Sequence, residues 1–514
     1  MGSFSKKSTE ADATCGTGVH PPSAPTNGAG EEIPSMSRPN PLKRGHVLFV
    51  AVLALLLGGF AFACGDDGGG AAACEGASCD GGSGASTTDG PSGTDGNTIG
   101  DGGPGGDADA DADSSIPPSC GDAGPGTLDP TFGDGGIVML SYPGASANAV
   151  VIQGDGRIVI GGYTSSHLAV VRLLPDGSVD PSFGVGGIAE IAVGGSQVIG
   201  AVALQPDGKI VAAGTALKDF VVVRLNSNGN LDSTFGDAGV VTTNINGTDV
   251  ANSVIILADG RVLATGTTGP ASNTDFALVQ YNSNGSLDTT FGAAGIVTTD
   301  FRATNDTGGV AVLAANKIVV SGGSYVPAAG FQGNFAVARY DGNGTLDPTF
   351  GDGGKLLTAD APADFTGALD AVIDPTGKYV LAGSKGGAFT IARVTPGANL
   401  DTSLGTTGLV TAGFGGSGGY ARSIFVQSDG KLVASGVATF GANPSAIGVA
   451  RFTSGGALDT SFGLGGTVST SLAPAYSLQG NGSAMGSCNF IVVGTFDDQG
   501  LGGTTYMGAM RYRL

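Results

Sequence analysis

The chain has 514 residues, of which 44 are acidic and 23 are basic, so its formal net charge is −21. No basic stripe is present to neutralise phosphates, which argues against nucleic acid as a partner. The chain contains no tryptophan and only three histidines, so side chains that often carry catalysis are scarce.

The first 63 residues consist of a leader and an export signal. An apolar run from Val47 to Ala63 follows a Lys-Arg pair and ends in Ala-Phe-Ala, the three-part pattern of a secretory signal peptide. A membrane-spanning anchor is the alternative, although about 17 apolar residues is short for a bilayer span. Residues 1–35 fit no export logic, and a start at Met36 would make residues 36–63 a signal of ordinary length.

Cys64 directly follows this signal, where a bacterial lipoprotein carries its lipidated cysteine. This position predicts a lipid anchor as the one contact with the membrane, in the outer membrane or at the cell surface. Ala61 stands where leucine is usual and Phe62 where a small residue is usual, and an ordinary signal peptidase also accepts Ala-x-Ala. Plain secretion is therefore the alternative, and the protein is exported in both cases.

Residues 64–127 are predicted to form a disordered tether. Positions 65–127 contain no lysine, arginine or aromatic residue, so this segment cannot bury enough apolar surface to fold. In an exported, oxidising setting disulfides persist, and we expect Cys74 to pair locally with Cys79. Cys120 and Cys488 are then left, and they can pair if the fold brings the two ends of the domain together.

The remainder of the chain, 128–514, is a repeat domain. The phrase Leu-Asp-x-Thr/Ser-Phe-Gly, with small variations, begins at positions 128, 179, 231, 287, 346, 400 and 458, a spacing of 51 to 59 residues. Regular self-similarity at this period is the signature of repeat architectures. Features that occur in every unit are most simply explained by what each unit needs in order to fold.

Each unit contains four short apolar segments rich in valine and isoleucine and bounded by Gly, Asn or Asp, which predicts antiparallel strands. In the first unit the segments are Ile137–Ser141, Ala149–Gln153, Arg157–Tyr163 and Leu168–Leu173. A tight turn, usually containing Asp-Gly, joins the second segment to the third, as a two-residue hairpin requires.

The predicted fold is all-β: a seven-bladed β-propeller of four-stranded antiparallel blades. A stacked solenoid is the alternative, but its coils are usually shorter. The small-residue strand before the Asp-Gly turn suits the crowded centre, which makes the strand after Phe-Gly the outermost one. The domain then opens with an outer strand, Ile137–Ser141, and this N-terminal strand should complete the last blade and close the ring.

An arginine stands eight residues before the motif aspartate in five units, which predicts a structural ion pair in each. The pairs are Arg172 with Asp180, Arg224 with Asp232, Arg339 with Asp347, Arg393 with Asp401, and Arg451 with Asp459. Arg511 has no aspartate after it and Asp129 no arginine before it, so these two should meet in a closed ring. A ring of arginines that binds an anionic ligand is the alternative interpretation.

The unit around residue 340 shows the complete pattern: Phe-Ala-Val-Ala-Arg-Tyr at 335–340, Asp-Gly-Asn-Gly at 341–344 and Leu-Asp-Pro-Thr-Phe-Gly at 346–351. This pattern resembles the delta-60 repeat family of bacterial exported proteins. The resemblance implies a propeller-like repeat in a secreted or surface protein, and it carries no established activity to transfer onto residues of this chain. The sixth unit departs from the pattern with Leu404 in place of phenylalanine.

The repeat region offers little for catalysis, since it contains one histidine, His167, and one glutamate, Glu190, and no recognised catalytic motif. We therefore predict a non-enzymatic, monomeric scaffold that binds a protein or a glycan. The alternative is a periplasmic or surface enzyme, such as a lactonase, lyase or hydrolase, that uses the central channel and calcium.

Two sets of residues are candidate sites. Oxygen ligands alternate round one Gly-rich turn, as in calcium loops, at Asp341, Asn343, Thr345 and Asp347; a plain Asn-Gly turn explains the same residues. A binding patch is expected where long loops gather on one face, at Asp300, Arg302, Asp306, Tyr325 and Phe331; solubilising loops without a ligand are the alternative.

Overall fold

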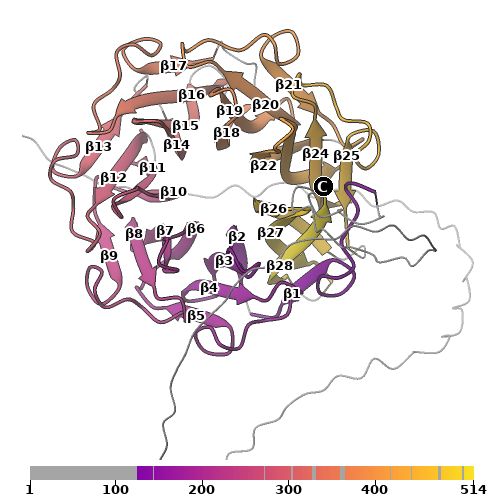
Figure 1. The fold of residues 1–514 in the computed structure, drawn as a ribbon, viewed down its shortest axis with the longest axis horizontal. Coiled ribbons are helices and arrows are strands. Elements are labelled where there is room, and N and C mark those ends of the chain that lie inside the picture. The colour runs from indigo at the N-terminus through magenta and orange to yellow at the C-terminus, as the bar shows by residue number, and fades with distance from the viewer. Residues whose placement is uncertain are drawn as a thin grey trace, which may run out of the picture. The chain divides into compact units, whose positions relative to one another are not determined.

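The computed structural model describes residues 124–142, 144–270, 273–301, 305–326, 332–358, 365–416, 418–441, 443–472, 476–500 and 503–514. These residues form seven four-stranded antiparallel sheets, arranged as a ring (Figure 1). The described part of the chain contains no helix that is long and apolar enough to cross a membrane. The predicted leader, the signal peptide and the tether up to residue 123 lie outside the described residues.

In each blade the four strands lie side by side, in order from the centre of the ring to its rim (Figure 1). The innermost strands are β2 (Ser146–Ile152), β6 (Gln197–Leu204), β10 (Val250–Ile256), β14 (Asn305–Ala314), β18 (Phe365–Ile373), β22 (Gly418–Val426) and β26 (Tyr476–Met485). The second strands are β3 (Ile158–Tyr163), β7 (Ile210–Ala216), β11 (Val262–Thr268), β15 (Lys317–Val326), β19 (Tyr379–Lys385), β23 (Leu432–Phe440) and β27 (Asn489–Asp498).

The outer half of each blade completes the sheet. The third strands are β4 (Leu168–Leu173), β8 (Asp219–Leu225), β12 (Asp275–Tyr281), β16 (Gln332–Asp341), β20 (Ala388–Val394), β24 (Asn443–Phe452) and β28 (Thr504–Arg513). The rim strands are β5 (Ile188–Ile191), β9 (Val240–Thr243), β13 (Ile296–Thr299), β17 (Lys355–Leu357), β21 (Leu409–Ala412), β25 (Thr467–Thr470) and β1 (Ile137–Leu140).

The N-terminal strand closes the ring. β1 is the rim strand of the seventh blade, whose strand order is β1-β28-β27-β26, and it pairs antiparallel with β28 in the register Ile137 to Met510. The prediction of seven four-stranded blades with an N-terminal closing strand is therefore confirmed. We call the junction of the two chain ends, where β1 and the residues before it pair with β28, the seam. It begins slightly before residue 128, since Gly126 N donates to Arg513 O at 2.9 Å.

The hydrophobic core is divided into seven clusters, each between two neighbouring blades. The phenylalanine of the repeated phrase, or leucine in the sixth unit, belongs to each cluster because the phrase forms the turn before the rim strand. These side chains are fully buried: Phe132, Phe183, Phe235, Phe291, Phe350, Leu404 and Phe462. The repeated phrase is thus explained by packing between blades.

The repeated arginine joins its own blade to the next one. In the fourth blade, Arg339 Nε lies 2.9 Å from Asp347 Oδ2, and the guanidinium also donates to Pro396 O of the following blade at 2.6 Å. Its Cζ stands 4.7 Å from the centre of the Phe350 ring. The other predicted pairs have Nε to Oδ2 distances of 2.6 to 2.9 Å, and the seam pair, Arg511 with Asp129, has 2.8 Å.

We expect these carboxylates to make the fold sensitive to acid below about pH 4. Burial alone would raise the pKa of Asp459, but donors from Ser461 and the charges of Arg451 and Lys431 lower it to about 2. A lowered folded-state pKa stabilises the fold above the unfolded value near 3.9, and this contribution is lost as pH falls towards 2. Thermal unfolding midpoints between pH 5 and pH 2 should fall steeply below pH 4, and an unchanged midpoint at pH 2.5 would contradict this prediction.

Candidate functional site

Each innermost strand carries a β-bulge, and the bulges form a ring in the central channel. The register of β2 shifts between Ala147 and Ala149, and comparable shifts occur in the other six innermost strands. A bulge turns a side chain out of the ladder and is common beside binding sites. The bulged residues that line the channel are Asn148, Gly200, Asn252, Gly309, Leu369, Arg422 and Asn481.

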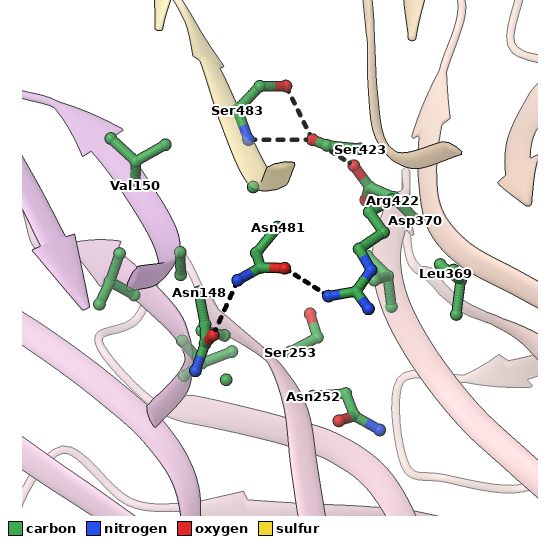
Figure 2. A pocket seen from close by; sticks show the side chains of 17 residues that line it. Asn148, Val150, Asn252, Ser253, Leu369, Asp370, Arg422, Ser423, Asn481 and Ser483 are labelled. Atoms are coloured by element: carbon green, nitrogen blue, oxygen red, sulfur yellow. Dashed lines mark hydrogen bonds between the residues drawn. The ribbon is translucent and has the colours of Figure 1, made fainter. Parts of the chain in front are cut away.

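The bulge ring lies between two cavities of the channel. A cavity of about 540 Å³ includes Val198, Thr307 and Tyr420, which precede the bulges in their strands. It therefore lies towards the face that carries the loops between blades. A smaller cavity of about 190 Å³ lies towards the Asp-Gly turns and contains Asp370, Ser423 and Ser483. Figure 2 shows the polar side chains that converge on this smaller cavity.

The three amides of the bulge ring each join one blade to the next. Asn148 Nδ2 donates to Ile199 O at 2.9 Å, and Asn252 Nδ2 donates to Gly308 O at 2.7 Å. At the seam, Asn481 Nδ2 donates to Ala147 O at 2.8 Å. These bonds fix the three amide groups in the channel wall, where they line both cavities.

Arg422 is the cation of this ring. Its guanidinium donates to Asn481 Oδ1 (Figure 2), and its Cζ lies 5.0 Å from the centre of the Tyr420 ring. Arg422 has no ion pair with a carboxylate within the described residues. The nine other described arginines each lie within 4.0 Å of a carboxylate: Arg157, Arg172, Arg224, Arg261, Arg339, Arg393, Arg451, Arg511 and Arg513. A guanidinium that lines a cavity and is not paired with a carboxylate of the protein is suited to bind an anionic group of a ligand.

Asp370 is the carboxylate of the smaller cavity. Its Oδ1 accepts from Ala371 N at 2.8 Å, and its Oδ2 accepts from Ile424 N at 2.8 Å and from Ser423 Oγ at 3.0 Å. Burial in the channel wall raises the pKa of Asp370 to about 6, although these donors oppose the shift. Ser423 also accepts from Ser483 Oγ at 2.9 Å, so the network links blades five, six and seven.

The residues of the predicted loop patch differ in burial. Asp306 is fully buried, whereas Asp300 is exposed, and one carboxylate oxygen of each lies within 4.8 Å of an oxygen of Asp275. Tyr325 is half-buried, and its hydroxyl accepts from Gly367 N of the next blade at 2.7 Å. Arg302 and Phe331 lie outside the described residues.

The predicted calcium loop uses its carboxylates in ion pairs. Asp341 Oδ1 pairs with Lys317, and Asp347 Oδ2 lies 2.9 Å from both Lys317 Nζ and Arg339 Nε. The oxygen of Asn343 accepts from Thr345 N at 3.1 Å, as in an ordinary Asx turn. The loop therefore has the contacts of a structural turn, with cations already beside both carboxylates.

Cys488 is disulfide-bonded, and it is the one cysteine among the described residues. Cys64, Cys74, Cys79 and Cys120 lie outside the described residues. The predicted pairing of Cys488 with Cys120, the pairing of Cys74 with Cys79 and the lipidation of Cys64 therefore stay predictions.

A closed ring of seven four-stranded antiparallel blades around a polar channel defines a seven-bladed β-propeller. Five segments of the chain, residues 153–183, 205–235, 257–291, 316–350 and 427–462, are similar to the family described as "Domain of unknown function (DUF5122) beta-propeller". A comparison with curated proteins gave no significant match.

Several solved structures are similar at low identity. Virginiamycin B lyase from Staphylococcus aureus is 11% identical with a TM-score of 0.45, over 74% of this chain and 98% of that one. A protein of unknown function from Dyadobacter fermentans is 13% identical with a TM-score of 0.38, over 74% and 99% of the two chains. The polysaccharide lyase Uly1 is 11% identical with a TM-score of 0.37, over 71% and 89%. Identities this low bear on the fold alone.

Proposed function

We propose that this propeller is a binding protein of the cell envelope and that its ligand is an acidic glycan held in the channel. The observation that carries this proposal is Arg422, a guanidinium in the channel wall without a carboxylate within 4.0 Å among the described residues. A sugar carboxylate supplies the planar partner that a guanidinium prefers. The surrounding amides and the Tyr420 ring supply hydrogen bonds and an aromatic face for the rest of a sugar.

The proposal is tested by binding of the purified protein to an oligosaccharide array. We expect binding to glycans that carry uronic acids or other carboxylated sugars and no binding to their neutral counterparts. Binding that survives reduction of the carboxylates to alcohols would contradict the proposed role of a charged group. Capture of a protein partner, with no glycan bound, would favour the protein alternative.

Catalysis is a second candidate function, and Asp370 is the observation in its favour. A carboxyl with a pKa near 6 in a cavity can exchange a proton near neutral pH, as a lyase or hydrolase requires. However, both oxygens of Asp370 already accept hydrogen bonds from its own strand and from blade six, which suits a clamp between blades. Mass spectrometry of acidic oligosaccharides after long incubation distinguishes the two functions, since only an enzyme leaves shortened products.

For the cellular setting, we propose an exported monomer of the delta-60 repeat type that is lipidated at Cys64. The support is the apolar run before Cys64 and the position of the repeats after a glycine-rich segment. Labelling with a palmitate analogue should mark the protein in membrane fractions, and Cys64→Ser should remove the label. A Cys64→Ser protein that keeps the label would rule out this residue, and an unlabelled wild-type protein in the medium would establish plain secretion.

A further inference from the structure

One positive and one negative charge lie in the wall of the channel. Among the described residues that line its two cavities, Arg422 is the one basic residue and Asp370 the one acidic residue. Arg422 belongs to the bulge ring and lines both cavities, whereas Asp370 lines the smaller one. The channel wall therefore offers a cation to one carboxylate of a ligand and none to a second.

The smaller cavity is unsuited to an acidic sugar. Its volume of about 190 Å³ is below the 300–1,000 Å³ that is usual for ligand pockets. Asp370 lies in its wall, hydrogen-bonded to Ser423, which also contacts Ser483 (Figure 2). At pH 7 the Asp370 carboxyl is mostly ionised, since its pKa is about 6. A sugar carboxylate in this cavity would be near a like charge and without a cation, which is costly.

Three valines also line the smaller cavity. Val150, Val202 and Val254 each stand two residues after the bulged residue of their strand, in blades one to three. A sugar hydroxyl beside them would give up hydrogen bonds to water without a partner in return, which costs free energy. The charge and the apolar groups of this cavity therefore both disfavour a sugar, and a bound glycan should end at the bulge ring.

The larger cavity suits neutral sugars. Its volume of about 540 Å³ is within the range of ligand pockets. The half-buried Tyr420 ring, 5.0 Å from Arg422 Cζ, offers a flat apolar surface to the C–H face of a sugar. The Thr307 hydroxyl and the Asn148 and Asn252 amides line the same cavity and can hydrogen-bond sugar hydroxyls. Apart from Arg422, the described residues that line this cavity are uncharged.

We propose that the ligand is an otherwise neutral oligosaccharide with a single carboxylated sugar at one end, and that it binds end-on. The carboxylate lies at Arg422 in the bulge ring, and the neutral sugars extend through the larger cavity towards the face that carries the loops between blades. This inference rests on the proposed function and narrows its ligand class. A polyuronate, with a carboxylate on every sugar, is disfavoured because only one of its carboxylates would meet a cation of the channel wall.

Strand β14 offers a matched pair of positions on the two sides of the bulge ring. Thr307 is exposed and lines the larger cavity, whereas Val310 is half-buried and lines the smaller one. The bulged residue Gly309 lies between them in the sequence. Thr307→Phe would fill the space that the neutral sugars require, and Val310→Phe would fill the cavity that the ligand does not enter. The two variants therefore test the placement of the ligand with the same change in side chain size.

The test is a thermal-shift screen of the full-length protein at pH 7, followed by calorimetric titration, since a ligand of the folded state raises the unfolding midpoint. Sialylated and glucuronylated oligosaccharides carry one carboxylate at the non-reducing end, and aldonic acids made from neutral oligosaccharides carry it at the reducing end. Galacturonan and alginate oligomers carry one on every sugar. We expect a single-acid oligosaccharide to bind with one site per chain and at least tenfold more tightly than the polyuronates.

For the oligosaccharide that binds, Thr307→Phe should weaken the affinity at least tenfold and Val310→Phe less than threefold, with circular dichroism as the check on folding. Equal effects of the two variants, or a larger loss for Val310→Phe, would overturn the end-on placement. Polyuronates that bind the wild-type protein as tightly as single-acid oligosaccharides would overturn the inference and leave the proposed function in place. No binding of any carboxylated sugar would contradict the proposed function itself, and this inference with it.

Discussion

Replacing Arg511 by glutamine is expected to weaken the closure of the ring and to lower the free energy of unfolding by about 3–5 kcal/mol, the range for one broken partner of a buried ion pair. Arg511 Nε lies 2.8 Å from Asp129 Oδ2, and its guanidinium donates to Pro175 O of blade one and stands 4.7 Å from the centre of the Phe132 ring. The substitution therefore removes an ion pair, a bond between blades and a ring contact at once.

The seam between blade seven and blade one differs from the other junctions in its second cation. In six blades a lysine or arginine at the start of the second strand lies within 4.0 Å of the motif aspartate: Arg157, Lys209, Arg261, Lys317, Lys378 and Lys431. The seventh blade has Asn489 at that position. Asp129 has Arg513 as its second cation, at 3.6 Å, compared with 2.9 Å for Lys317 beside Asp347 in blade four. Blade three shows the effect of such a cation, since Asp288 is held by Arg261 at 2.8 Å although Gln280 replaces the usual arginine.

Arg339→Gln is the matched control, because Arg339 makes the same kinds of contact inside the ring while Lys317 stays 2.9 Å from Asp347. Urea unfolding of both variants should show the larger loss for Arg511→Gln. Equal losses would mean that the seam is no weaker than any other junction, and no loss in either variant would refute the structural role of these pairs.

The blades could be predicted from the sequence because their determinants are local and repeated. Glycine turns, apolar segments and the spacing of eight residues between Arg339 and Asp347 each recur within one unit. The seam followed from counting, since Arg511 and Asp129 were the two members left without a partner within their own repeat. Regular repetition thus reveals what all blades share.

The channel could not be predicted in the same way, because its residues differ between blades. A bulge displaces one residue from the ladder, and a pattern of alternating apolar residues does not show which residue that is. One signal was present for Arg422: the residue eight positions later is Gly430, so Arg422 lacks the spacing that pairs each repeated arginine with its motif aspartate. Asp275 was missed because it belongs to the preceding repeat, and only the ring brings it beside Asp300 and Asp306.

Arg422→Gln is expected to weaken binding of the acidic glycan by about 30- to 4,000-fold, which corresponds to the roughly 2–5 kcal/mol lost when one partner of a hydrogen-bonded charge pair is truncated. Glutamine keeps a donor for Asn481 but removes the charge that the proposed carboxylate requires. The unfolding midpoint should change little, because Arg422 forms no ion pair within the described residues.

Arg157→Gln is the control for this prediction, since it removes one positive charge from a side chain that is 40% exposed and lies at an Asp-Gly turn. If both variants weaken binding equally, the ligand responds to net charge and does not occupy the channel. If Arg422→Gln binds the acidic glycan as tightly as the wild-type protein does, the guanidinium is not in the site. A loss confined to Arg422→Gln, together with unchanged binding of any neutral glycan, would place the carboxylate of the ligand at the bulge ring, since Arg422 is the one cation among the bulged residues.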